Sequence, residues 1–551
     1  MVKVLFVIPP YFNIDDFISK NRANVLPAFT MPYGILSLDA YLKAQCISSV
    51  GTSILDLNVP LNEILKKPGV SQDEVLKMLV DTVRDRVSEF EPELVGISAL
   101  FNSSFRYMEN IAATVKSATD DIMVVAGGGL PSAAYKEMLE FCPSVDAICK
   151  GEGEMPMAAL IDAGDRYASC AMHPSWITRE GVTKGKVPGH TFVQNLDDIP
   201  PLDYSGLDLD NYNSRSIDKR YIGEKKREMA IHTSRGCPFL CVFCSNPSLH
   251  GKAVRTMSID RVAAEVKRMR DEFGLTVLMI EDDHFFHDKE RAKEIMRRLI
   301  VLDIRIEFPN GVAVYAIDDE VAELFSKAGV STVALAVESG SDYVLNHIIK
   351  KPLKKRLIKP AVEALRRHAV QSHVFIVIGL PGEMPEHRDE TLRMMLDSGF
   401  DWAHIYCAIP IFGSRLYDIC TANGYIESSN PLDFINTKSV IRAPGVDPDE
   451  IEKVAYEMNL KANFIYNYNV KIGNYPTAIN YFKNVCEKYP GHAFAHYYLG
   501  KALIASNLDK DTGVKNLKKF AQIVRVDSWW KVQSEKYGLL DEAKEIEGES
   551  I

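Results

Sequence analysis

Three cysteines on one short loop constrain this chain more than any other feature of its sequence. Cys237, Cys241 and Cys244 are spaced C-x3-C-x2-C and follow the apolar run Met229–Ile231, which predicts a strand. A closed iron–sulfur site needs four cysteines, so three thiolates can bind three irons of a [4Fe–4S] cube and leave the fourth iron open. An open iron is a coordination site for a substrate or cosubstrate, like the open position of a catalytic zinc.

The same three cysteines also fit two plainer interpretations, a zinc loop or three thiols of a core. Zinc needs a fourth cysteine or histidine at matching spacing, and the nearest histidines, His232 and His250, lie outside the loop. A cluster loop must turn tightly and exclude water, and the residues suited to this are Gly236, Pro238, Phe239, Leu240, Val242 and Phe243. The motifs further along the chain favour the cluster.

The length and charge of the chain bound its architecture and its partners. At 551 residues it is too long for one core, so three or four domains are expected. A net charge of −10 without a long basic run argues against nucleic acid and anionic membranes as partners, and no apolar stretch approaches a membrane span. Met1–Pro10 predicts a strand rather than a signal peptide. Ten scattered cysteines indicate a cytoplasmic protein that keeps its thiols for metal rather than for disulfides.

Residues 1–160 alternate short apolar runs with helical patterns, which predicts a doubly wound, Rossmann-like parallel sheet. The predicted strands are Val4–Ile8, Ser53–Leu57, Leu94–Ser98, Met123–Ala126 and Ala147–Cys149, and the predicted helices are Ile35–Ala44, Glu74–Phe90, Met108–Ser117 and Ala133–Phe141. Such sheets bind ligands beyond the carboxyl ends of their strands. Small residues at several of those ends, including Gly127–Gly129, would admit a large flat ligand.

Residues 161–228 are polar and marked by prolines, which predicts a linker. The alternation of strands and helices resumes over residues 229–430, with strands expected at Met229–Thr233, Thr276–Glu281, Arg305–Asn310, Thr332–Glu338, His373–Gly379 and His404–Ala408. Six such units are too few for a closed eight-stranded barrel. Chemistry in related barrels lies at the carboxyl ends of the strands, and these ends carry Glu281, Asp282, Asp283, Asn310, Glu338, Ser339, Ser341 and Gly379. Each is commonplace alone, but their order after the cysteine loop is hard to assign to chance.

The cysteine loop and the strand ends that follow it resemble the radical S-adenosylmethionine (SAM) superfamily. The resemblance implies a partial (β/α)6 barrel in which Cys237, Cys241 and Cys244 bind a [4Fe–4S] cluster, and SAM chelates the open iron and is cleaved reductively to a 5′-deoxyadenosyl radical. It implies that the following residues bind SAM: Glu281, Asp282 and Asp283 at the ammonium group, Asn310 at the adenosine, Glu338 at the ribose, Ser339 and Ser341 at the carboxylate, and Gly379 at the adenine.

Residues 1–160 resemble the cobalamin (B12)-binding domain that precedes many radical SAM domains, in the pieces Met31–Gly34, Val95–Ser98, Val124–Pro131 and Asp146–Glu154. The resemblance implies bound cobalamin, contacted by Pro9, Pro10, Tyr11, Tyr33, Ser98, Leu100, Asn102, Ser103, Gly127, Gly128, Gly129, Gly151, Glu152, Gly153 and Glu154. The first histidine of the chain is His173, so this domain lacks the D-x-H-x-x-G loop and cannot supply an imidazole to cobalt. A water, a non-nitrogen side chain or an empty lower face stay open. The alternative is a degenerate α/β domain that binds nothing.

Residues 431–551 change to helical patterns. Ala478, Phe482, Val485 and Pro490 fall at offsets that resemble a tetratricopeptide helix, and an irregular second unit begins at Tyr498–Gly500. Two interpretations stand side by side, a helical cap on the barrel mouth and a docking site for a carrier or partner protein. Further along, Trp529 and Trp530 would pack the cap down or line a substrate entrance.

A few further side chains are candidates for proton or hydrogen-atom transfer near the expected barrel mouth. These are His284, His287 and His373, together with Tyr406 and Cys407, which end the sixth predicted strand and would face the substrate. A thiol can donate a hydrogen atom because its S–H bond is weak. A lone histidine or a buried thiol is nonetheless more often a packing residue than a catalytic one.

Together the two resemblances predict a B12-dependent radical SAM enzyme, a methyltransferase acting on an unactivated carbon of a small or natural-product-like substrate. The first alternative is a cyclase or rearrangement enzyme, like the anaerobic magnesium-protoporphyrin ester cyclase. A methylthiotransferase would need grouped N-terminal cysteines, whereas Cys46, Cys142 and Cys149 are scattered. A cobalamin sensor with a helical tail is the non-enzymatic alternative, and it leaves the cysteine motif unexplained. An enzyme of this kind also needs a low-potential electron donor, a flavodoxin or ferredoxin.

Overall fold

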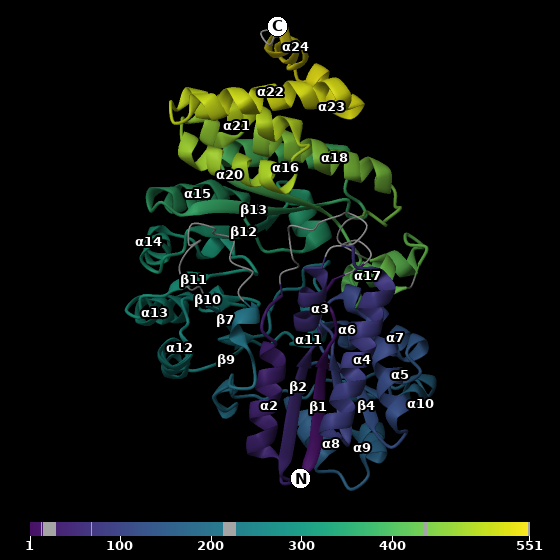
Figure 1. The fold of residues 1–551 in the computed structure, drawn as a ribbon. Helices are drawn as coiled ribbons and strands as arrows, with labels where there is room; N and C mark the ends of the chain where they lie inside the picture. Colours follow the sequence, from purple (N-terminus) through teal and green to yellow (C-terminus); the bar gives the residue numbers. More distant parts are fainter. Residues whose placement is uncertain are drawn as a thin grey trace.

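The computed structural model describes residues 1–12, 14, 29–67, 69–212, 227–428, 430–434 and 438–548. Figure 1 shows three regions stacked along the molecule: a sheet with flanking helices near the N-terminus, barrel strands in the middle, and a group of helices at the C-terminal end. Of the segment predicted as a linker, residues 213–226 lie outside the described part. Among the described residues there is no helix both long and apolar enough to cross a membrane.

The N-terminal sheet has the strand order β2-β1-β3-β4-β5-β6. Its strands are β1 (Val2–Ile8), β2 (Val50–Asp56), β3 (Leu94–Ser98), β4 (Met123–Gly127), β5 (Ala147–Cys149) and β6 (Trp176–Ile177). The first five are parallel, which confirms the prediction of a doubly wound sheet, and the order places the topological switch point between β1 and β3. The two-residue strand β6 pairs antiparallel with β5 and comes from the segment predicted as a linker.

Helices cover both faces of this sheet, because consecutive residues of its strands are apolar and point to opposite faces. Leu5 and Val7 of β1 belong to one core cluster, and Val4, Phe6 and Ile8 belong to another. The helices are α2 (Tyr33–Gln45), α3 (Asn58–Leu65), α4 (Gln72–Phe90), α5 (Phe105–Ala118), α6 (Gly129–Ala133), α7 (Tyr135–Phe141), α8 (Glu154–Ile161), α9 (Arg166–Met172) and α10 (Arg179–Thr183). The predicted helix Ala133–Phe141 corresponds to α7, which begins two residues later because the backbone of Ala134 lies outside the helical region.

Six parallel strands form the barrel in two halves of three. One half has the order β11-β10-β7, and the other has the order β12-β13-β14. Their bounds are β7 (Glu228–Ile231), β10 (Val277–Ile280), β11 (Arg305–Glu307), β12 (Thr332–Glu338), β13 (Gln371–Ile378) and β14 (Trp402–Cys407). A parallel bridge between Val312 and Leu335 joins the halves, so the strands make the open, six-stranded barrel that the resemblance implied.

Helices connect the barrel strands and a short hairpin carries the cysteine loop. The main helices are α12 (Ile259–Phe273), α13 (Lys289–Ile300), α14 (Asp319–Lys327), α15 (Ile358–Arg367), α16 (Pro385–Ser398) and α17 (Arg415–Ala422). The hairpin pairs β8 (Ser234–Arg235) with β9 (Arg255–Thr256) in antiparallel register. The short helix α11 (Asn246–Leu249) lies between these two strands in the sequence. All three cysteines of the loop lie between the hairpin's two strands.

The C-terminal region is helical, as predicted, and has its own aromatic core. Its elements are α18 (Pro448–Leu460), the π-helical turn η10 (Lys461–Ile465), α19 (Tyr468–Lys471), α20 (Tyr475–Lys488), α21 (Ala493–Ala505), α22 (Lys510–Val526), α23 (Ser528–Lys536) and α24 (Leu540–Gly548). Gly500 and Gly513 let α21 and α22 touch, since a Cβ on Gly500 would lie 2.8 Å from the carbonyl oxygen of Gly513. Trp530 is buried in this core, whereas Trp529 is 43% exposed.

These helices close the free edge of the barrel at β14. The Asn463 side chain of η10 accepts from the Ala403 N–H and donates to the Ala403 carbonyl, both at 2.8 Å, and so takes the place of a neighbouring strand. Tyr481 of α20 stacks on Trp402, with ring centroids 5.1 Å apart. These contacts involve the first residues of β14, at the opposite end from the barrel mouth.

Candidate active site between the sheet and the barrel

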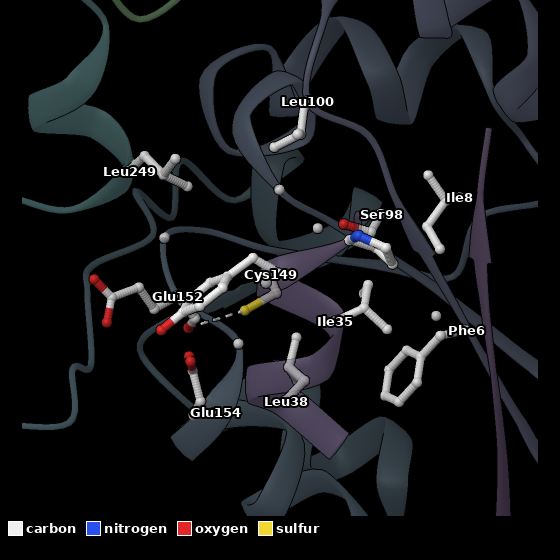
Figure 2. A pocket seen from close by; sticks show the side chains of 18 of the residues that line it. Phe6, Ile8, Ile35, Leu38, Ser98, Leu100, Cys149, Glu152, Glu154 and Leu249 are labelled. Carbon is white, nitrogen blue, oxygen red and sulfur yellow. Dashed lines mark hydrogen bonds between the residues drawn. The ribbon is translucent and has the colours of Figure 1, made fainter. Parts of the chain in front are cut away.

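A cavity lies where the carboxyl ends of the N-terminal strands face the barrel. Figure 2 shows Phe6 and Ile8 of β1 on one side of it and Glu152 on the other, with Leu38 of α2 next to Glu154. The barrel contributes His232, Arg235, Leu249, His250, Glu281, Asp283 and Asn310 to its wall. One cavity is thus bounded by the switch point of the sheet and by three strand ends and the cysteine hairpin of the barrel.

Ten of the residues predicted to contact cobalamin line this cavity: Tyr11, Tyr33, Ser98, Leu100, Gly127, Gly128, Gly151, Glu152, Gly153 and Glu154. Glycine is required at Gly128, where φ is +94° and a Cβ would lie 2.6 Å from the carbonyl oxygen of Ala99. The wall at Gly127 is bare backbone, because the atom nearest to a Cβ there would be 3.8 Å away. A flat macrocycle can therefore approach the main chain at this strand end.

The other five predicted contacts shape the loops instead of lining the cavity. The carbonyl groups of Pro9 and Pro10 accept hydrogen bonds from Asn58 and Ser104, respectively. The Ser103 hydroxyl donates to the Tyr11 carbonyl at 2.6 Å, and the Asn102 amide donates to the Phe434 carbonyl at 3.1 Å. Gly129 begins helix α6. The hydrogen bonds of Pro9, Pro10, Asn102 and Ser103 fix the loops beside the cavity, and their predicted contacts with cobalamin stay predictions.

Two aspartates after β10 hold the cysteine loop in place. Asp282 accepts from the N–H and hydroxyl of Thr233 and from the Ser234 hydroxyl, each at 2.6 Å, and burial raises the pKa of Asp282 to about 6. Asp283 accepts from the Gly236 N–H at 3.1 Å. Gly236 has a φ of +95°, and a Cβ there would lie 2.4 Å from the Ala253 carbonyl oxygen. Asp282, predicted as a SAM ligand, therefore faces the loop, whereas Asp283 also faces the cavity.

The three cysteine thiols lie near one another and near one cation. Burial raises the pKa of all three thiols, and the ammonium group of Lys351 lowers the pKa of Cys237 and Cys241. Lys351 Nζ lies 2.9 Å from Glu338 Oε1. Among the described residues no three His, Cys, Asp or Glu side chains are grouped closely enough for a single metal ion.

The sequence did not single out Lys351, although two consecutive lysines follow the turn after the fourth barrel strand. Its buried ammonium group provides the cation that a carboxylate ligand beside the cluster needs. Glu338 is 8% exposed, as predicted for a residue at a strand end, and its φ is +71°. The pair places one cation and one anion next to the cysteine loop.

The remaining predicted SAM residues differ in what they face. Asn310 lines the cavity and donates to the Glu281 carbonyl at 2.9 Å, so it ties two strand ends together. Ser339 contacts the Thr391 hydroxyl at 3.1 Å, and the buried Ser341 hydroxyl has no hydrogen-bond partner. Gly379 donates its N–H to Glu383 at 2.5 Å, and a Cβ on it would collide with Ile451 of α18. Its backbone is thus closed off by α18.

The proton-transfer candidates separate into two groups. His284 lies beside the cysteine loop, with its ring 5.2 Å from that of Phe239 and its Nε2 hydrogen-bonded to the Tyr315 hydroxyl, and burial lowers its pKa to about 4. His287 is its neighbour, at 6.0 Å between rings. His373 lies near the start of β13, where its Nε2 is 2.8 Å from the Tyr481 hydroxyl, so its predicted place at the mouth is wrong.

The last two candidates, Tyr406 and Cys407, are adjacent on β14 and so point to opposite faces. Tyr406 shares a face with Phe375 and His404, with ring centroids 6.0 and 6.4 Å away. Cys407 lies on the other face, near Glu452 of α18, and burial raises its pKa to about 11. Cys407 therefore does not face the barrel interior, where the prediction placed it, and its position favours the buried thiol over the hydrogen-atom donor.

Two histidines considered above only as possible zinc ligands, His232 and His250, belong to the cavity wall. The ring of His232 lies 4.8 Å from that of Tyr33, and burial lowers the pKa of His232 to about 3. His250 Nδ1 lies 2.8 Å from Glu152 Oε1. The missed signal was their position, since His232 directly follows a barrel strand.

Comparison with known proteins agrees with this geometry. Residues 231–395 match the radical SAM superfamily, and residues 22–161 match the B12 binding domain. Cytidylyl-2-hydroxyethylphosphonate methyltransferase of Streptomyces wedmorensis is 27% identical over 424 residues, which cover 72% of this chain and 78% of that protein. Anaerobic magnesium-protoporphyrin IX monomethyl ester cyclase of Rubrivivax gelatinosus is 26% identical over 410 residues, covering 73% and 67%.

Two solved structures share the fold. The radical SAM methyltransferase TsrM from Kitasatospora setae, solved with cobalamin and a [4Fe–4S] cluster, aligns with a TM-score of 0.57 at 17% identity, covering 78% of this chain and 76% of that one. The cobalamin-dependent SAM radical enzyme OxsB, solved with aqua-cobalamin, aligns with a TM-score of 0.61 at 14% identity, covering 100% and 84%. This chain belongs to the radical SAM enzymes that carry a B12-binding domain.

Proposed function

We propose that this protein is a cobalamin-dependent radical SAM methyltransferase that adds a methyl group to an unactivated carbon of a small-molecule substrate. The observation that carries the proposal is the shared cavity, whose wall combines the glycine-rich strand ends of the sheet with the cysteine hairpin and strand ends of the barrel. A cofactor on the sheet and a cofactor on the hairpin would meet there without a diffusible intermediate.

The residues present fit both cofactors. Cys237, Cys241 and Cys244 supply three thiolates, while Lys351 and Glu338 supply opposite charges for the carboxylate and ribose of SAM. We keep the other predicted SAM contacts at Glu281, Asp283 and Asn310, which line the cavity, and at the free Ser341 hydroxyl. When bound, the cluster and SAM supply a carbon-centred radical, and cobalamin supplies the methyl group.

The rest of the cavity wall would protect this chemistry from water. Ile8, Ile35 and Leu38 give it an apolar face beneath a flat ligand, and the glycines bring the main chain into contact. Radicals and low-potential metals are quenched in water, so a dry, preformed wall is what the chain itself contributes. The proposal assigns cobalamin to residues 1–160, SAM to residues 229–430, and a linking and a helical segment to residues 161–228 and 431–551.

A cyclase or rearrangement enzyme is the second candidate, because the Rubrivivax cyclase matches 73% of the chain and the methyltransferase matches 72%. In either case reduction of the cluster needs an outside electron donor, for which we propose a flavodoxin or ferredoxin. All ten cysteines are free thiols, which fits a reducing compartment such as the cytoplasm. A carrier or partner protein at the C-terminal helices stays part of the proposal.

The test begins with oxygen-free protein, whose metal content and visible spectrum should show iron, sulfide and cobalt corrin together. With reductant and SAM it should form 5′-deoxyadenosine or a demethylated SAM product. Cys241→Ala should lose the cluster absorbance and all reductive SAM cleavage, while Cys486→Ala, a half-buried thiol of α20, should retain both. Zinc in place of iron, or unchanged cleavage in Cys241→Ala, would refute the proposal.

Isotope labelling separates the two candidate reactions. With SAM carrying a deuterated methyl group, a methyltransferase places the label in the product, whereas a cyclase leaves the product unlabelled. Candidate substrates are screened as mixtures of small metabolites, and labelled products are read by mass spectrometry. An oxidised or ring-closed product without label would move the assignment to the second candidate.

A further inference from the structure

A buried carboxylate next to the cavity, Glu152, receives hydrogen bonds from three side chains of the barrel region. Arg235 Nη1 and Arg255 Nη1 donate to Glu152 Oε2 at 3.0 and 2.9 Å, and a second nitrogen of Arg255 donates to Oε1. His250 Nδ1 lies 2.8 Å from the same Oε1. The side chains of Glu152, Arg235 and Arg255 are only 3%, 6% and 6% exposed.

A second carboxylate, Glu154, extends this contact to the helix at the cavity wall. Arg235 Nη1 lies 2.9 Å from Glu154 Oε1, and Arg235 Nη2 donates to the hydroxyl of Ser37 on α2 at 2.9 Å. The Ser37 hydroxyl in turn donates to Glu154 Oε1 at 2.7 Å. Arg235 therefore bridges two carboxylates and a helix of the N-terminal sheet region with one guanidinium group.

The far side of the network is fixed to the segment between the two regions. Arg255 donates to the Val193 carbonyl at 2.9 Å, and its guanidinium lies 4.3 Å above the ring of Phe192. Arg235 and Arg255 face each other across the β8–β9 hairpin. Two arginines and two glutamates thus make a closed, locally neutral network.

The position of this network gives it a role beyond stability. Arg235 precedes Cys237 by two residues, and its hairpin holds the whole cysteine loop. Glu152 lies in the loop after β5 and Glu154 is the first residue of α8, and both line the cavity, with Glu152 on the side away from Phe6 and Ile8 of β1. The same two carboxylates therefore wall the proposed cobalamin site and grip the loop proposed to bind the cluster.

Buried ions allow little positional freedom. Each charge has been removed from water, and the network repays that cost only when its hydrogen bonds keep good geometry. A sliding contact of apolar side chains would permit small shifts between the two regions at little cost. Misplacement of reacting groups by about 1 Å can slow a reaction about a hundredfold, so such shifts would matter.

We propose that Glu152, Glu154, Arg235 and Arg255 form an interdomain clasp that sets the distance between the cobalt and the iron–sulfur cluster. These are positioning residues, which act through the cysteine loop and the cavity wall and not on the substrate. The inference rests on the proposed function, since it requires both cofactors to be bound. It adds a structural reason why the two cofactors keep a fixed distance from each other.

The experiment measures that distance directly and needs no substrate. Cob(II)alamin and the reduced [4Fe–4S] cluster each carry an unpaired electron, and their magnetic coupling falls with the cube of the distance. The readout is the microwave power that half-saturates the cob(II)alamin EPR signal, compared between reduced and oxidised cluster in the same protein. In the unaltered protein, reduction should raise this power severalfold.

Three variants test the clasp. Glu152→Gln and Glu154→Gln keep the size of the side chain but remove its charge, and they should lower the reduced-to-oxidised ratio below that of the unaltered protein while iron and cobalt stay bound. Glu307→Gln is the matched control, because Glu307 pairs with Arg305 at 2.6 Å, is 8% exposed and lies within the barrel. It should keep the ratio of the unaltered protein.

Each outcome decides one of the two claims. An unchanged ratio in cofactor-loaded Glu152→Gln overturns the clasp but leaves the proposed function standing. If Glu152→Gln does not fold, Glu154→Gln decides between the outcomes, because this variant keeps the Arg235–Glu152 and Arg255–Glu152 contacts. Loss of a cofactor from Glu154→Gln would mean that the network builds one cofactor site, and it would overturn the clasp. Unaltered protein that binds no cobalt or no iron overturns the proposed function itself.

Discussion

The barrel meets its two neighbours through junctions of opposite character. At the β8–β9 hairpin, buried arginines and glutamates bind the N-terminal region. At β14, the neutral Asn463 amide and the rings of Tyr481 and Trp402 bind the C-terminal helices. Charged networks demand geometry, whereas neutral amides and stacked rings give stability at lower cost in desolvation. The difference teaches that precision is concentrated at the junction that carries the cofactors.

The strongest way to break this comparison is to remove the central carboxylate of the charged junction. Glu152→Ala leaves Arg235 and Arg255 buried without their shared partner and should lower the free energy of unfolding by about 3–5 kcal/mol. Denaturant unfolding followed by circular dichroism measures the loss. Glu140→Ala, at an exposed site of α7, should change it by less than about 0.5 kcal/mol. A loss at Glu152 as small as that would show that water reaches the network.

The neutral junction should be weaker and should fail without touching the cofactors. Asn463→Ala leaves the N–H and carbonyl of Ala403 unpaired in a buried place and should cost about 2 kcal/mol. Limited proteolysis should then release the C-terminal helices sooner, with iron and cobalt contents unchanged. Cofactor loss in this variant would contradict the division of labour between the junctions.

Acid should loosen the neutral junction before the charged one. Burial lowers the pKa of His373 to about 3, so its stabilising contribution is present above the ordinary value of 6.5 and is lost as the pH falls from there toward 3. Arg235, Arg255 and His250 together hold the pKa of Glu152 below its ordinary 4.5, so the charged junction weakens only below that pH. Proteolysis at pH 5.5 should therefore cut the C-terminal helices first. In His373→Gln, this cleavage should begin only at a lower pH.

The smallest expected effect comes from one hydroxyl. Tyr481→Phe keeps the stacking on Trp402 but loses the hydrogen bonds to Gln371, at 2.7 Å, and to His373, at 2.8 Å. A cost of about 1 kcal/mol is expected, measured by thermal unfolding. A cost as large as that of Asn463→Ala would mean that the hydroxyl, and not the amide, holds the junction.

Much of the architecture could be predicted from local patterns. The cysteine spacing, the alternation of strands and helices, and the glycines at strand ends are all short-range signals, and they gave the sheet, the open barrel and the helical end. The antiparallel β6 escaped notice because two residues are too short for any periodicity. The five-residue helix α6 was not predicted, because its glycine and proline are typical of a loop.

Side-chain directions within the site could not be predicted in the same way. Glu281, Asp282 and Asp283 are consecutive carboxylates, and only tertiary contacts decide that Asp282 turns toward Thr233. The Glu152–Arg235 contact spans 83 positions of sequence and leaves no local trace. The error at His373 was avoidable, because a residue that opens a predicted strand lies at the end opposite its carboxyl terminus.

The way Asn463 closes the barrel makes few demands on the barrel's own sequence. The Asn463 side chain forms its hydrogen bonds with main-chain atoms of Ala403, so another segment that places an amide side chain at this position can pair with the edge of β14. The closing helices are therefore constrained only where they contact side chains of the barrel. A chimera needs to preserve the carboxamide, the aromatic stack beside it, and the hydrogen bonds of Tyr481 to Gln371 and His373 and of Asn469 to Asp401.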